Sequence, residues 1–518
     1  MKFTSKLRVS IAVACVVATT SSFAADSLEA AFAKGKVNGN LQAWYINDSF
    51  TAGAGSPKTG TAGNPKARGQ AAVGGVLSYV TDPYYGINGG ATFISSNLLG
   101  QNPNAGNNQG TYTATSSSAV SSIDYNSNTL SEAYIQGVYG KTTAKVGEQI
   151  LDTPLATSLE GARIFLRTFK AGVLTNADIP DTTLVAAYVN GMQTSSSAMY
   201  GGSVPGSLGG TNNAQASINL GYQGMDTVAF GDLANAITGG ANNPVWALAA
   251  INKSLPGLTA QAWFYQATNV LNAWWFQGDY KYSVNNDIGL FAGAQFLNEG
   301  GTGTTQSSFK NGLNSTKGGI TTNALAPYCN GGNMPSATKN VPGNVSTCSS
   351  GISSNYFAFK VGGSYENLTL SAAYSNTSYK DSAAMDGSLI MPWGGNQTKL
   401  YTSTMIGNAT AGGTQATLWK AEYKFDGVLQ GLYAAGAYGL YAAKAAAQDA
   451  FYTANIYGYK PSDIVGNMGY SGMYGEIKYD LNKQTSFRWQ IEQDTMMGQV
   501  AGFPKAALES RLMGIYKF

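Results

Sequence analysis

A group of charged side chains in the first third of the chain is well suited to act on a small solute. Arg163, Arg167 and Lys170 fall within eight residues, with few acids nearby beyond Asp152 and Glu160. Facing cationic and anionic groups create a transverse field that favours polar molecules over apolar ones. The same residues on an outward loop would form an ordinary solvated charge cluster. The pattern indicates electrostatic selection of solutes, provided that the segment lines a passage.

Covalent chemistry has little support in the sequence. Histidine is absent from the 518 residues, which removes the commonest general base, the Ser-His-Asp and Cys-His arrangements and most zinc sites. We therefore predict that the protein is not an enzyme, and we predict no catalytic residue, no metal ligand and no cofactor.

Residues 1–24 have the features of a secretory signal peptide. Three basic residues precede an apolar core over 9–18 that is too short to span a bilayer, and Ser22-Phe-Ala24 offers a small-x-small cleavage site. Acylation of Cys15, as in a lipoprotein, is the less favoured interpretation because few apolar residues precede it. No other segment approaches the roughly 18 apolar residues of a membrane helix. We expect an exported protein whose membrane spans are strands.

The chain is neither strongly hydrophobic nor rich in charged residues. Charged residues make up 11% of the chain, Gly and Tyr number 65 and 31, and the mean hydropathy is −0.12. Such values are the average of lipid-facing strand positions, polar interior positions and soluble loops. The 31 basic residues less the three of the leader leave 28, which equals the number of acidic residues. A balanced chain lacks the basic footprint of a nucleic-acid partner.

Several segments alternate apolar and polar residues with the period of a β-strand. Residues 274–282, 419–426 and 487–492 place aromatic and aliphatic side chains on one face and polar or charged ones of both signs on the other. A water-soluble sandwich would show the same alternation. Each segment alone is therefore ambiguous.

The spacing of the breaks between these segments resolves the ambiguity. About eight short turns, rich in Pro, Gly, Asn and Asp, alternate with about nine other breaks, nearly all of them long and polar, which implies about 18 strands. A sandwich has no reason to sort its connections by length. The longer class comprises 48–67, 98–128, 152–168, 193–244, 268–272 (the one short exception), 297–354, 378–417, 442–469 and 494–505.

The last strand of the chain ends on an aromatic residue. Leu512, Gly514, Tyr516 and Phe518 share one face, whereas chain termini of soluble domains usually fray. An ordinary half-buried strand could read the same way, but the closing strand of an outer-membrane barrel must present apolar side chains to lipid up to its end. We interpret Tyr516 and Phe518 as a signal for barrel assembly.

The charged faces of the C-terminal segments predict a basic wall inside the barrel. Glu422, Glu476 and Glu492 lie on the same faces and dilute it. The predicted wall consists of Lys420, Lys424, Lys478, Arg488, Arg511 and Lys517.

Several motifs resemble the OprD-like outer-membrane porins. The most specific run is Leu130-Ser-Glu-Ala-Tyr134, Lys145-Val-Gly147, Gln149 and Leu151-Asp-Thr-Pro-Leu155. Weaker matches extend along the chain and include Arg163, Thr168-Phe169, Ala171, Leu370-Ser-Ala-Ala-Tyr374, Gly387-Ser-Leu, Pro392-Trp-Gly-Gly395 and Tyr401-Thr-Ser403, and Leu28-Glu-Ala-Ala-Phe32 with Gly35-Lys-Val-Asn-Gly39 resembles the start of the related epsilon-branch major porins.

The resemblance implies an 18-stranded passive channel whose third loop folds inward to form an eyelet. It places Asp152, Arg163 and Thr168-Phe169 on that loop. The chain departs from the family where acids are usual, with Gly161 and Lys170, and Glu148 stands where an arginine is common. A preference for basic amino acids, described for part of the family, therefore does not transfer.

Together these observations predict an all-β fold, a transmembrane antiparallel up-and-down barrel of about 18 strands with short periplasmic turns and long external loops. Residues 1–24 are the signal peptide, 25–35 a periplasmic segment, and 36–518 the barrel, with 152–170 folded inward. Asp152, Glu160, Arg163, Arg167 and Lys170 are predicted at the constriction.

The predicted function is passive diffusion of small hydrophilic solutes and ions across the outer membrane of a Gram-negative bacterium. The expected partners are outer-membrane lipid, lipopolysaccharide, the barrel-assembly machinery and such solutes, with no nucleic acid. A homotrimer and a monomer both stay open, as does an adhesin that uses the long external loops.

Cys329 and Cys348 stand in a stretch rich in Gly, Asn, Ser and Thr, and an exported compartment favours a disulfide between them over a redox role. A closed loop of about 20 residues gains around 3 kcal/mol in the chain-entropy model. Mass spectrometry of protein isolated without reductant should find the two thiols joined; two free thiols would refute the bond. Replacing both cysteines should leave conductance nearly intact.

Overall fold

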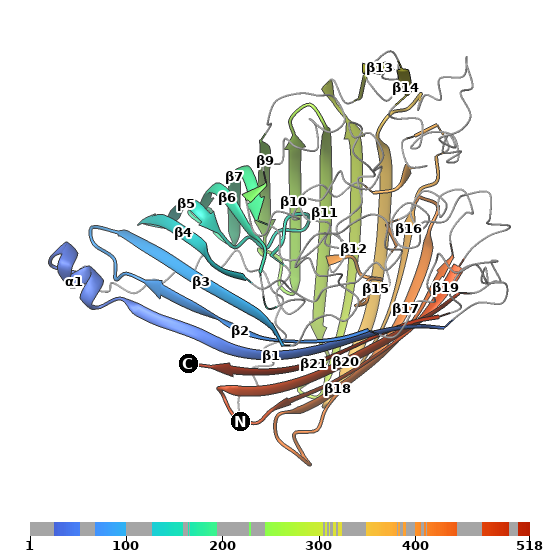
Figure 1. The fold of residues 1–518 in the computed structure, drawn as a ribbon. Helices are drawn as coiled ribbons and strands as arrows, with labels where there is room; N and C mark the ends of the chain where they lie inside the picture. The colour runs from blue at the N-terminus through green and yellow to red at the C-terminus, as the bar shows by residue number, and fades with distance from the viewer. Residues whose placement is uncertain are drawn as a thin grey trace.

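The first long strand pairs with the last, which closes the sheet into a barrel. In the computed structural model, β1 (Lys36–Thr51) pairs antiparallel with β2 (Arg68–Val80) on one side and with β21 (Ala506–Lys517) on the other. Figure 1 shows these strands side by side along the lower wall. Each strand in the ring is hydrogen-bonded to two antiparallel neighbours, so the barrel has no open edge.

Eighteen strands form the wall, as the sequence predicts. The two-residue β8 (Thr227–Val228) joins only the end of β7, and β13 (Asn314–Lys317) and β14 (Ile320–Asn323) form a separate hairpin. The remaining wall strands are β3 (Ile87–Leu99), β4 (Ser127–Tyr139), β5 (Thr142–Gln149), β6 (Thr168–Asn176), β7 (Thr182–Gln193), β9 (Val245–Asn252), β10 (Leu258–Ala267), β11 (Leu271–Ser283), β12 (Ile288–Gly301), β15 (Ser353–Tyr365), β16 (Leu368–Thr377), β17 (Gln415–Lys424), β18 (Leu432–Ala442), β19 (Gly469–Asp480) and β20 (Thr485–Met496).

The structure describes residues 25–51, 68–99, 127–158, 164, 166–193, 227–228, 244–303, 306–307, 310, 314–317, 320–323, 349–380, 382–383, 387–389, 399–405, 409–410, 412–442, 469–496 and 506–518. The predicted signal peptide and both Cys329 and Cys348 lie outside these ranges. Within them, no helix is both long and apolar enough to span a bilayer.

The short connections lie at one end of the barrel and the long ones, with the three-residue link from β10 to β11, at the other, because strands and connections alternate around a closed antiparallel ring. The turn from β2 to β3 has Tyr85 and Gly86 at its centre, both with positive φ (51° and 78°). Two positive φ values define the type I′ turn, whose twist suits a tight hairpin. Several expected loops begin later than predicted. The largest shift is at β12, which continues to Gly301 because its ladder runs on opposite β11 and β15.

A short helix fills the segment before the barrel. α1 (Leu28–Ala33) begins at Ser27, whose hydroxyl accepts a hydrogen bond from the Ala30 amide at 3.0 Å. The Tyr79 hydroxyl donates to the Phe32 carbonyl, and the Asp82 amide donates to the Ala31 carbonyl. These contacts attach α1 to the turn that follows β2, at the end where β1 begins (Figure 1).

The outer face of the barrel is apolar and exposed. Trp274, Trp419 and Trp489 are 40–46% exposed, and many Leu, Val, Ile, Phe and Tyr side chains are similarly open on the same face. Soluble proteins rarely expose apolar patches of more than a few hundred Å². A hydrocarbon environment accommodates such a surface, and the closed ladder leaves no backbone group unpaired against lipid along the strands.

Trp489 offers a direct test of this face, because its neighbours Ile477 and Leu512 across the ladder are also exposed outward. Replacing Trp489 by Arg should lower the free energy of unfolding by roughly 2 to 4 kcal/mol if the residue lies near the bilayer midplane. Urea titration in lipid vesicles measures the loss, and Trp489→Phe is the matched control, expected to lose far less. Equal small losses in both variants would mean that the face does not contact lipid.

Candidate functional site

The loop between β5 and β6 begins with a compact hairpin over 151–158. The Ser158 amide donates to the Leu151 carbonyl at 2.9 Å, and the Thr153 amide donates to the Ala156 carbonyl at 2.8 Å. The Thr157 hydroxyl donates to Asp152 Oδ1 at 3.1 Å. These bonds satisfy the backbone of a segment that leaves the wall, so that it holds its shape without a neighbouring strand.

This loop crosses the interior of the barrel. Leu155 is fully buried in a large apolar cluster that includes Tyr265 of β10. Ile164, nine residues later, is fully buried in a different cluster with Trp44 of β1 and Met513 of β21. Since β10 and β1 lie four strands away from β5 in opposite directions around the ring, the loop spans nearly half the circumference. Leu155 and Ile164 both fall within the segment 152–170 that is predicted to fold inward, whereas Thr168, Phe169 and Lys170 belong to β6 of the wall.

A second loop, between β16 and β17, also packs inside the wall. The Gln295 side chain of β12 donates to the Lys399 carbonyl at 2.7 Å, and the Tyr441 hydroxyl of β18 donates to the Thr402 carbonyl at 2.7 Å. Further along, the Met405 amide donates to Glu492 of β20 at 2.7 Å. Residues 399–405 therefore bridge wall strands on two sides. Tyr401-Thr-Ser403 is one of the motifs that carry the family resemblance, but nothing in the sequence predicts the inward fold of this loop.

An ion pair joins the two inward loops. Lys399 Nζ lies 2.5 Å from Asp152 Oδ1, and both side chains are mostly buried. Beside it, the Tyr401 hydroxyl donates to Asp279 at 2.8 Å, and Lys360 Nζ lies 4.1 Å from the centre of the Tyr401 ring. Burial and the nearby Asp279 charge raise the pKa of the Tyr401 hydroxyl, so it stays a neutral donor. The two loops thus form one connected structure within the barrel.

The interior is divided into an apolar half and a polar half. Buried side chains of β6, β7, β9, β10, β11, β12 and β15 form one continuous apolar cluster, to which the loops add Leu151, Leu155, Leu389 and Leu400. The charged interior side chains of the remaining wall stand mainly on β4, β5, β17, β19 and β20. Two smaller apolar clusters lie beside them, one around Trp44 and Met513 and one around Tyr441 and Tyr470. The loops cover the large apolar cluster, whereas Lys420, Glu422 and Arg488 on the other side keep 28–34% of their side chains exposed.

The predicted constriction residues occupy different places. Asp152 lies at the junction of the two loops. Arg167 is 7% exposed, its Nη1 donates to the Thr157 carbonyl at 3.3 Å, and burial lowers the pKa of its guanidinium to about 10. The Arg167 side chain is therefore packed against the loop. It is not exposed inside the barrel, contrary to the expectation. Glu160 and Arg163 lie outside the described residues.

Lys170 lies on the outer face, which corrects its expected position at the constriction. Its neighbours Phe169 and Ala171 both point into the apolar cluster, and successive side chains of a strand point to opposite faces. Lys170 Nζ is 3.7 Å from Glu148 of β5, which also faces outward. This pair cannot act on a solute inside the barrel.

The expected basic wall is not purely basic. Four of its six members stand beside acids: Lys420 beside Glu422 at 2.9 Å, Lys478 beside Asp480 at 2.7 Å, Arg488 beside Glu476 at 2.7 Å, and Arg511 beside Glu509. Lys424 and Lys517 are exposed at the strand ends near the short turns. A wall of adjacent opposite charges exerts a much weaker field than a bare basic wall would, because each base and its acid largely cancel at a distance.

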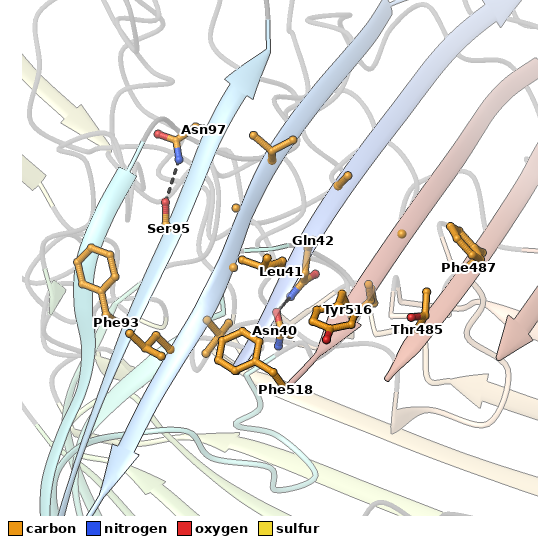
Figure 2. Close-up of a pocket in the computed structure, with 18 residues that line it drawn as sticks. Asn40, Leu41, Gln42, Phe93, Ser95, Asn97, Thr485, Phe487, Tyr516 and Phe518 are labelled. Carbon is orange, nitrogen blue, oxygen red and sulfur yellow. Dashed lines mark hydrogen bonds between the residues drawn. The ribbon is translucent and has the colours of Figure 1, made fainter. Parts of the chain in front are cut away.

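Tyr516 and Phe518 lie on the outer face and border a groove of about 740 Å³ across β1, β2, β3, β20 and β21. Figure 2 shows Leu41, Phe93 and Phe487 along the same groove. Leu41, Phe93, Phe487, Tyr516 and Phe518 are 43–60% exposed. The groove belongs to the apolar outer surface, on the opposite side of the strands from the polar interior, and is not a solute site within the barrel.

Comparison with solved structures identifies the fold. The chain is similar to OpdK of Pseudomonas aeruginosa, solved with vanillate (TM-score 0.61, 13% identity, 94% of this chain and 99% of that one). It is also similar to OccK2 of the same organism with glucuronate (0.60, 12%, 94% and 98%) and to OprD (0.57, 12%, 94% and 96%). The fold is that of the OprD-like porins. No family model and no curated protein matches the sequence.

The ion pair between the inward loops can be measured directly. Asp152→Asn and Lys399→Gln should each weaken the attachment of the loops, and the double variant should lose less than the sum because the pair is already broken. We expect a coupling energy on the order of 1 kcal/mol for a partly exposed pair. Unfolding in detergent measures the cycle; strictly additive losses would mean that the loops are not joined through these side chains.

Proposed function

We propose that the chain is an outer-membrane porin of the OprD-like family, a passive diffusion channel for small hydrophilic solutes and ions. The observation that carries the proposal is the two-sided barrel: it has an apolar outer face, partly exposed charged side chains inside on β17, β19 and β20, and two loops that fold into the interior. The likeness to OpdK, OccK2 and OprD in fold supports the same function.

The proposed site is the outer membrane of a Gram-negative bacterium, reached after removal of residues 1–24 and insertion by the barrel-assembly machinery. The pairing of β21 with both β1 and β20, with Leu512 and Tyr516 exposed on the outer face, supports this location. The apolar outer face suits lipid and lipopolysaccharide as neighbours, and a homotrimer is one arrangement that it allows. OpdK, which shares the fold, is itself an outer-membrane protein.

The loop from Asp152 to Arg167, which precedes β6, forms the proposed constriction together with 399–405 of the second loop. Asp152 at the loop junction supports this assignment, and Glu160 and Arg163 keep their proposed place on the first loop. The alternative function, adhesion through the external loops, rests on segments outside the described residues and gains no support from the barrel interior.

The test is a planar-bilayer recording of the purified, refolded protein. We expect stepwise, ohmic increases in current, since the passage carries no moving gate in the proposed mechanism, and we expect no turnover of any solute. Barrel integrity is checked by the shift in gel mobility on heating. A correctly folded barrel that gives no conductance would contradict the proposed channel.

A further inference from the structure

The polar wall carries a connected row of charges and hydroxyls on β17–β20. Lys420 Nζ lies 2.9 Å from Glu422 Oε1, which also accepts a hydrogen bond from the Tyr433 hydroxyl at 2.5 Å. Across β18, the Arg488 guanidinium donates to both carboxylate oxygens of Glu476, at 2.7 and 3.1 Å. The row thus contains two bases and two acids and has no net charge.

Small side chains on β18 open this row to the passage. Ala435 stands between Glu422 and Glu476 in the ladder, and Ala437 stands between Lys420 and Tyr474. Neither methyl group can cover its larger neighbours. Lys420, Glu422 and Arg488 retain 28–34% exposure of their side chains, so a solute can touch both signs of charge at once.

The described ion pairs elsewhere in the interior are balanced in the same way. On β4 and β5, Lys145 Nζ lies 3.7 Å from Glu132. On β11 and β15, Lys360 Nζ lies 3.5 Å from Asp279, and Asp152 pairs with Lys399 at the loop junction. These described bases therefore face inward with their counter-ions attached, whereas Lys424 and Lys517 stand apart at the strand ends near the short turns.

The pairing of bases with acids affects which solutes the wall favours. A carboxylate solute gains most from a base without a partner, and here it must displace an acid that is already in place. A solute without net charge does not have to break an ion pair. The donors and acceptors of the wall can replace its hydrogen bonds to water one at a time.

We propose that this wall selects hydrophilic solutes that carry no net charge, such as uncharged polyhydroxy compounds and zwitterions, over carboxylate anions of the same size. The inference rests on the proposed channel function. It differs from the chemistry of the vanillate and glucuronate bound in OpdK and OccK2, both of which carry a carboxylate.

Reversal potentials in a salt gradient test the charge balance. The wild-type channel should prefer neither ion by more than about twofold, because paired charges nearly cancel along the ion path. Glu422→Gln should favour anions and Lys420→Gln should favour cations, each by roughly threefold, since one unit charge about 8 Å from the path in water changes an ion's energy by about RT.

Glu148→Gln is the matched control, since it removes an equal charge from the pair with Lys170 on the outer face. It should leave the reversal potential unchanged. A strongly anion-selective wild type, or lumen variants that shift no more than this control, would overturn the inference while leaving the channel function in place. Absence of conductance in the folded wild type would instead contradict the proposed function.

Solute uptake by liposomes tests the selection itself. Glucose and glucuronate share a ring and differ by the carboxylate, so the wild-type protein should admit glucose several-fold faster, and alanine should report on zwitterions. Glu422→Gln should reduce the difference between the uptake rates of glucose and glucuronate, because Lys420 would then be free of Glu422 and could bind the carboxylate of glucuronate. Equal or faster uptake of glucuronate by the wild type would contradict the proposal.

Discussion

Closure of the hydrogen-bonded ladder is the constraint on which the rest of the structure depends. Where backbone groups have no water to bond with, they must bond with one another, and the pairing of β1 with β21 removes the last open edges. The Gly39 and Phe518 backbones exchange hydrogen bonds at 3.1 and 3.2 Å, so the ladder is closed up to the final residue. Closure also determines which side chains point inward, because one face of every strand then lines the same interior and the other face lies outside.

The interior that closure creates is too wide to be filled by wall side chains alone, and loops fill part of it. One half is lined by apolar residues and is covered by the hairpin at 151–158 and by Leu389 and Leu400. The other side carries charged side chains, several of them in ion pairs. The loops are held both by apolar packing and by polar contacts such as Lys399 with Asp152 and the Met405 amide with Glu492.

Much of this could be predicted from the sequence. Connection lengths gave the strand number, and period-2 alternation gave the lumen faces of β17, β20 and β21. The pairs Lys420 with Glu422, Lys478 with Asp480 and Glu509 with Arg511 were also within reach, since residues two apart on a strand share a face. That signal would have replaced the basic wall with a balanced one.

Other features depend on tertiary structure. The face on which Lys170 lies depends on where β6 begins, and the register shifts between Lys170 and Ala171. A shift of one residue along a strand moves every side chain to the opposite face. Burial of Arg167 and the bidentate pair of Glu476 with Arg488 depend on loop packing and strand register. The inward fold of 399–405 carries no dense charge that would mark it in the sequence.

The division of the interior into a packed half and a water-filled half is tested most directly by cysteine accessibility. In a background where Cys329 and Cys348 are serine, single cysteines would replace Lys420, Glu422 or Arg488 on the polar side and Ala247, Ala273 or Ala358 on the apolar side. A charged, membrane-impermeant thiol reagent should reduce the current of the first three variants and leave the second three unchanged. A rapid loss of current with cysteine at position 247, 273 or 358, and none with cysteine at the polar positions, would show that the interior is not divided in this way.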